Sequence, residues 1–97
     1  MSDLQLLQIN GELEYTFDWA LEVPAGATVT AIDYVVPPQL VQFSDSDDLA
    51  NKKGKAGFRV NSAGGSPGKH GHTVQVEAKA TLSNNEKVPK YLTVRID

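Results

Sequence analysis

The sequence contains no cysteine, which excludes a disulfide framework and a cysteine-ligated zinc site. Long apolar runs are also missing, since none approaches the roughly 20 residues that a membrane-spanning helix requires. The start, 1–4, lacks the basic segment and apolar core of a signal peptide, so secretion is not predicted. What remains is a chain of 97 residues, the size of one domain with a single core.

Basic residues are absent from the first half of the chain. Residues 1–48 contain nine acids and no Lys or Arg, whereas residues 49–97 contain nine bases and three acids, which gives charges of about -9 and +6. Such asymmetry has two interpretations. Strands from the two halves pair their charges within one molecule, or the asymmetry marks surfaces that meet in head-to-tail contact between copies.

Alternating apolar and polar residues indicate strands throughout. The expected strands are 13–21, 28–36, 40–43, 56–60, 73–82 and 87–96, of which the last two form a hairpin around the turn 83–86. The segment 44–55 is predicted to be a polar loop and 61–71 a glycine-rich loop. Residues 1–11 form an N-terminal arm, either a loose edge strand or a docking segment, and 12–97 form the domain.

Strands with turn signals about every ten residues are typical of an immunoglobulin-like antiparallel β-sandwich of six to seven strands. No segment predicts a helix longer than one turn. The side chains expected in the core are Leu13, Tyr15, Phe17, Trp19, Ile32, Tyr34, Phe58, Val74, Val76, Leu82, Leu92 and Val94.

Metal and cofactor motifs are incomplete. The acids Asp45, Asp47 and Asp48 resemble the start of a calcium loop, but Ala50 and Ala56 stand where an EF-hand needs glycine and an acid. Two histidines, at 70 and 72, do not make a zinc site. The segment 65–69 lacks the first glycine and the final Ser/Thr of a phosphate-binding loop. The sequence therefore predicts no metal and no cofactor.

Catalysis and nucleic-acid binding are not predicted either. No serine lies in a nucleophile elbow, and the acidic isoelectric point near 5.2 disfavours nucleic acid. The aromatics at 15, 17, 19, 34 and 58 would suit a carbohydrate-binding face, but their spacing of two favours the core.

Three stretches in order resemble the fibre-tail adaptors of phages and prophages, also called Ig-like tail proteins. They are LEYTFDW at 13–19; PAGATV at 24–29 followed by YVVPPQL at 34–40; and GHTVQVEA at 71–78 running through to YLTVRI at 91–96. The family has Tyr-x-Phe-Asp-Trp, Gly-x-Thr-Ile leading into Val-Pro, and a final hairpin that ends Thr-Ile-Arg-Val. Here Tyr34 replaces the usual Trp, Asn84-Asn85 replaces a glycine-containing turn, and 44–55 is longer.

The resemblance implies a non-enzymatic virion structural or assembly protein, an adaptor that bridges tail or head-tail components. It implies other virion proteins as partners, with no nucleic acid and no membrane, and a location in the virion and, during assembly, in the host cytoplasm. The isolated domain is expected to be monomeric or weakly self-associating, with a ring as a candidate arrangement in the particle. The alternative is an Ig-like binding module, such as a carbohydrate-binding or adhesion domain.

The polar segment 44–55 is the candidate protein-contact surface, because it gathers charge of both signs. Its charged residues are Asp45, Asp47, Asp48, Lys52, Lys53 and Lys55.

Overall fold

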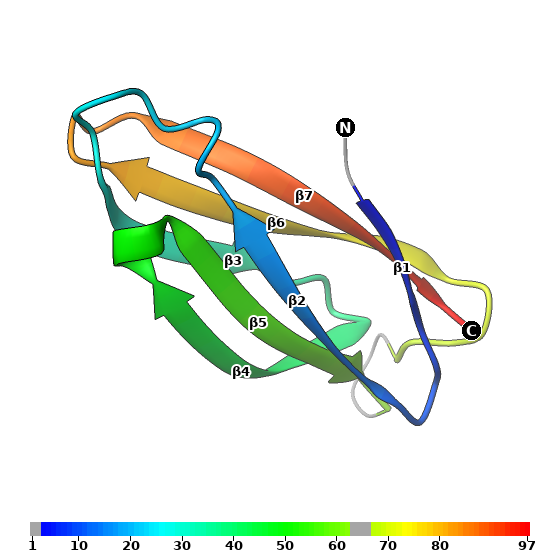
Figure 1. Cartoon of the computed structure of the whole chain (residues 1–97). Helices are drawn as coiled ribbons and strands as arrows, with labels where there is room; N and C mark the ends of the chain where they lie inside the picture. The colour runs from blue at the N-terminus through cyan, green and yellow to red at the C-terminus, as the bar shows by residue number, and fades with distance from the viewer. Residues whose placement is uncertain (1–2, 63–66) are drawn as a thin grey trace.

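Seven strands in two facing sheets make up the fold in the computed structural model, which describes residues 3–62 and 67–97 (Figure 1). The elements are β1 (Asp3–Leu7), β2 (Glu12–Asp18), β3 (Val29–Val35), β4 (Leu40–Asp48), the 3-10 turn η1 (Leu49–Asn51), β5 (Lys53–Val60), β6 (Thr73–Leu82) and β7 (Lys87–Ile96). Apart from η1 the described residues contain no helix, and so none that is long and apolar enough to cross a membrane.

The order of the strands confirms the immunoglobulin-like sandwich. One sheet has the order β2-β5-β4 and the other β1-β7-β6-β3. Numbered as A to G, the strands B, E, D and C, F, G keep the immunoglobulin arrangement. The first strand differs from the constant-type domain, since β1 pairs in parallel with β7 instead of joining the sheet of β2.

The core lies between the two sheets and uses the residues that alternation predicts. All twelve expected core side chains are either buried or packed against the buried cluster. Among the fully buried side chains, the largest are Trp19, Phe17 and Phe58, at most 2% exposed. Two aromatics of the first motif, Phe17 and Trp19, therefore fill the interior, and the third, Tyr15, packs against it.

The hairpin of β6 and β7 has the predicted bounds. Its register is continuous from Thr73 opposite Arg95 to Thr81 opposite Lys87. Asn85 in the connecting turn has a φ of 70°, a left-handed conformation that asparagine tolerates better than most residues. Strict alternation and an asparagine turn were sufficient to specify this element.

The prediction of a polar loop at 44–55 is wrong. β4 continues to Asp48 and β5 already begins at Lys53, so only the turn η1 and Lys52 separate the two strands. The added part of the ladder pairs Ser46 with Lys55 and Asp48 with Lys53. Opposite charges across a ladder favour pairing, and strand propensity depends on such neighbours more than on the residue itself.

The first predicted strand ends earlier than expected, at Asp18 instead of near residue 21. The Asp18 carboxylate accepts a hydrogen bond from the amide of Ala20, and the carbonyl of Trp19 accepts one from the amide of Val23. These local bonds turn the chain away from the sheet. Leu21 consequently points into solvent, with 97% of its surface exposed.

A bulge in β3 explains a core residue that alternation missed. The register with β6 shifts between Val29 and Ala31. Val29 is consequently buried and Thr30 exposed, while Ile32 and Tyr34 pack against the core as predicted. A bulge adds one residue to one strand, so the simple period of two is broken at that point.

The N-terminal arm contains an edge strand, one of the two alternatives that its sequence left open. β1 lies beside the last part of β7, with Leu7 opposite Ile96 and only 1% exposed (Figure 1). Leu4 and Leu6, on the opposite side of the strand, are each 60% exposed. Leu7 therefore anchors the arm in the core, whereas the side chains of Leu4 and Leu6 remain exposed to solvent.

Candidate functional site

The candidate contact surface is a single hairpin, formed by the ends of β4 and β5 and by η1. All six charged residues predicted for this surface lie on it. The hairpin tip is at the same end of the sandwich as the turn between β6 and β7 (Figure 1). The structure thus brings the six residues together, although on paired strands instead of on a loop.

Three of the six side chains already have partners within the molecule. Asp47 accepts a hydrogen bond from the Tyr34 hydroxyl at 2.9 Å. The Asp48 carboxylate accepts hydrogen bonds from the backbone amide and the side-chain amide of Asn51, at 3.3 and 2.7 Å, and so caps η1. Lys55 forms an ion pair with Glu14 at 2.9 Å. These contacts stiffen the hairpin from inside.

Tyr34 is the one residue of this region whose acidity is strongly altered. Burial and the hydrogen bond to the Asp47 carboxylate, together with the charges of Asp47 and Asp45, raise the pKa of Tyr34 well above its usual value. Both effects oppose the phenolate, because burial removes its solvation and a neighbouring carboxylate repels it. Tyr34 therefore acts as a neutral hydrogen-bond donor that joins β3 to the hairpin.

We expect Tyr34→Phe to lower the free energy of unfolding by about 0.5–1.5 kcal/mol at neutral pH, since one hydrogen bond is lost. The raised pKa also predicts alkaline sensitivity. Its contribution to stability is complete below the unfolded pKa of about 10 and is lost as the pH rises toward the higher folded pKa. Urea unfolding between about pH 8 and 11 measures both effects. The wild type should lose more stability than the variant, and parallel profiles would contradict this role.

Charges from the two halves of the chain lie side by side on the folded surface. Glu14 pairs with Lys55, Glu12 with Arg59 at 3.3 Å, and Glu22 with Lys90 at 2.8 Å. The first two pairs join β2 to β5, so acidic and basic strands are neighbours in one sheet. This arrangement supports charge pairing within one molecule over separate acidic and basic faces.

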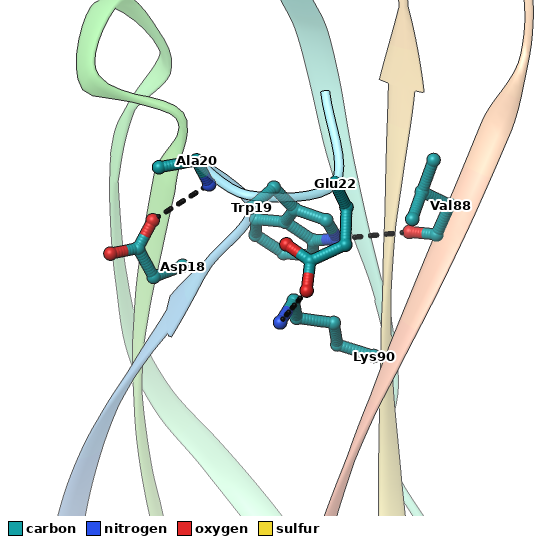
Figure 2. Close-up of polar contacts among 6 residues, drawn as sticks. All are labelled: Asp18, Trp19, Ala20, Glu22, Val88 and Lys90. Carbon is teal, nitrogen blue, oxygen red and sulfur yellow. Dashed lines mark hydrogen bonds and ion pairs between the residues drawn. The ribbon is translucent and has the colours of Figure 1, made fainter. Parts of the chain in front are cut away.

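Trp19, directly after β2, makes hydrogen bonds to two other segments, one of which is drawn in Figure 2. Its indole nitrogen donates a hydrogen bond to the carbonyl of Val88 in β7 at 3.0 Å. Its backbone amide donates to the carbonyl of Lys52 at 2.9 Å. Figure 2 also shows the ion pair between Glu22, in the loop after Trp19, and Lys90 of β7. With no exposed surface of its own, Trp19 serves the structure and is not a ligand platform.

An open hollow of about 460 Å³ lies where the turn after β1 meets the end of β5. It is lined by Ile9, Asn10, Gly11, Glu12, Arg59, Val60 and Ser62. The two charged side chains in this lining pair with each other, and the Arg59 guanidinium also stacks on the Phe43 ring at 4.7 Å from its centroid. The hollow therefore offers no charged group that is not already engaged.

The two histidines belong to no cluster of metal-ligating side chains in the described part of the chain. His70 and His72 are exposed in a turn before β6, and His72 Nδ1 accepts a hydrogen bond from the amide of Lys69. Residues 3–62 and 67–97 hold no group of three or more metal-ligating side chains. Gly65 and Ser66 of the phosphate-loop look-alike lie outside the described residues.

The exposed leucines of β1 are the surface feature that sequence reasoning did not identify. Leu4 and Leu6 lie on the outer side of the sheet, next to Thr93 and Arg95 of β7. Tyr91, 39% exposed, lies further along the same strand. The signal was present in the sequence, because Leu4 and Leu6 alternate with Leu7 and Ile9 and so place apolar residues on both sides of one short strand.

Comparison with protein-family models and with curated protein sequences found no match for this chain.

Proposed function

We propose that this chain is a non-enzymatic structural or assembly protein of a phage or prophage particle, an adaptor that bridges tail or head-tail components by protein contacts. It would reside in the virion and, during assembly, in the host cytoplasm. The proposal starts from the resemblance of the three sequence motifs. These motifs supply β2 with its Trp19 corner, the loop and β3 that follow, and the final hairpin of β6 and β7.

The observation that carries the proposal is the position of the aromatic side chains. Phe17, Trp19 and Phe58 are buried, and Tyr15 and Tyr34 are half-buried against them. A carbohydrate-binding module would need such rings on its surface, whereas among the described residues Tyr91 is the only large aromatic side chain with substantial exposure. What the domain offers to a partner is strand edges and a charged hairpin, which suit protein contacts.

Deletion of the gene from an inducible phage or prophage tests this function. Particles without the chain should show a tail or head-tail defect in negative-stain electron microscopy, and a plasmid copy should restore them. Normal, infectious particles in its absence would contradict the proposal.

A hairpin variant tests the candidate contact surface. Lys55 forms an ion pair with Glu14, so we leave it unchanged. The test variant is Lys52→Glu with Lys53→Glu, which reverses charge on the hairpin and keeps that ion pair. We expect the double variant to fold, because surface charges contribute only about 0–1 kcal/mol each, even where Lys53 lies opposite Asp48, but to restore infectious titre at least about tenfold less well than the wild type.

The matched control is Lys69→Glu with Lys87→Glu, which makes the same charge change at exposed positions off the hairpin. It should complement like the wild type. Equal titres from both double variants would show that the hairpin is not a contact surface.

A further inference from the structure

The backbone of β1 presents unused hydrogen-bonding groups on one side. The carbonyl of Leu7 accepts from the amide of Asp97 at 2.8 Å, and the amide of Ile9 donates to the carbonyl of Asp97 at 3.1 Å. Because backbone groups alternate along a strand, odd-numbered residues of β1 direct theirs toward β7 and even-numbered residues direct theirs away. Leu4 and Leu6 therefore point their amides and carbonyls outward, to an edge that no strand of the described chain covers.

β1 has fewer of the devices that shield the other sheet edges. β2 carries Glu12, Glu14 and Asp18, β3 has a bulge after Val29, and β4 has a bulge before Ser44 together with three acids near its end. Charges and bulges are the usual protection against edge-to-edge pairing. β1 keeps a continuous register with β7 from Asp3 to Leu7, has no bulge, lysine or proline, and carries a single charge, at its first residue Asp3.

The strand is complementary to itself in an antiparallel arrangement. With the twofold axis at Gln5, Leu4 of each copy lies opposite Leu6 of the other copy. These are the residues whose backbone groups point outward, so they fall at the hydrogen-bonded positions of an antiparallel pair. The same register brings the exposed leucine side chains together on one face. Gln5 meets its own copy, and an amide side chain can both donate to and accept from an identical one.

We propose that a second copy of this chain pairs antiparallel with β1 around Gln5, which joins two four-stranded sheets into one. This inference does not depend on the proposed function. The pairing involves a five-residue strand, so the interface falls below the roughly 1,200 Å² of stable complexes and the dimer is weak, with a Kd on the order of 100 µM. It rests on backbone bonds and leucines, so added salt does not dissociate it.

Disulfide trapping tests the register, because the chain has no cysteine of its own. Opposed residues at a non-hydrogen-bonded position have Cα atoms about 4.5 Å apart, within the range of a disulfide. Under mild oxidation, Gln5→Cys in the full chain, with any tag at the C-terminus, should form a covalent dimer at least about fivefold faster than Leu21→Cys. Leu21 is 97% exposed, so this control measures random collision.

A mixing experiment separates self-pairing from other contacts at the same edge. Leu4→Cys and Leu6→Cys chains should cross-link to each other faster than either does to itself. Sedimentation of the wild type from about 10 µM to 1 mM should show a dimer that Leu4→Lys with Leu6→Lys abolishes, with an unchanged circular dichroism spectrum. A wild type monomeric at 1 mM, Gln5→Cys no faster than the control, or mixing without preference would each overturn the proposal.

Discussion

Trp19→Ala is expected to lower the free energy of unfolding by about 3–5 kcal/mol, the usual cost of truncating a buried large aromatic. The ring is fully buried, and it stacks on Phe17 with the ring centroids 6.0 Å apart. Truncation also leaves the carbonyl of Val88 without its indole donor. For a domain of about 100 residues, each kcal/mol corresponds to roughly 4–8 °C in Tm, so the loss should be evident in thermal unfolding.

Trp19→Phe is the matched comparison. It removes the indole N–H but keeps more of the apolar volume than alanine does, so we expect a smaller cost, about 1–3 kcal/mol, for the lost bond to Val88 and the remaining cavity. If Trp19→Ala costs less than about 1 kcal/mol in urea unfolding, the ring does not hold the two sheets together at this corner.

Gly54→Val is expected to destabilise the domain by about 1–3 kcal/mol through overpacking. Gly54 lies on the inner side of β5, where an added Cβ would run into the Tyr34 hydroxyl and come within 2.9 Å of Ile32 Cδ1 and 3.3 Å of Asp47 Oδ1. Either the Tyr34–Asp47 hydrogen bond breaks or β3 moves away from the hairpin. Chemical denaturation measures the cost.

Lys53→Val is the control for that change. The neighbouring Lys53 points to solvent, so valine there adds strand propensity without entering the core, and stability should stay within about 0.5 kcal/mol. If Gly54→Val is as stable as this control, close packing of β3 against β5 does not require glycine at position 54.

The sequence was a good guide where one side of a strand is apolar. The residues Val74, Val76 and Leu82 alternate with polar ones, and this pattern alone determined β6 and its partner. It was a poor guide at β4, because Ser44 to Asp48 carry no apolar side and are held in the sheet by pairing with β5. The alternation of apolar and polar residues could not predict the bulge at Val29 or the turn after Asp18, because both are departures from regular strand geometry.

The candidate site divides in a similar way. The charged residues from Asp45 to Lys55 were grouped because they are close in the sequence, and in the structure they lie on one hairpin. Their partners could not be read from the sequence, since Tyr34 and Glu14 reach the hairpin only through the packing of distant strands. An edge strand was one of the two alternatives for the N-terminal arm, but the exposure of Leu4 and Leu6 was not predicted because it depends on the parallel pairing with β7.

The most direct test of the virion assignment is quantitative mass spectrometry of purified particles from cells that carry the gene. The account predicts that the chain co-purifies with intact particles through a density gradient and a high-salt wash, in a fixed molar ratio to a tail or head-tail protein. Its presence in the lysate but absence from washed, infectious particles would contradict the account.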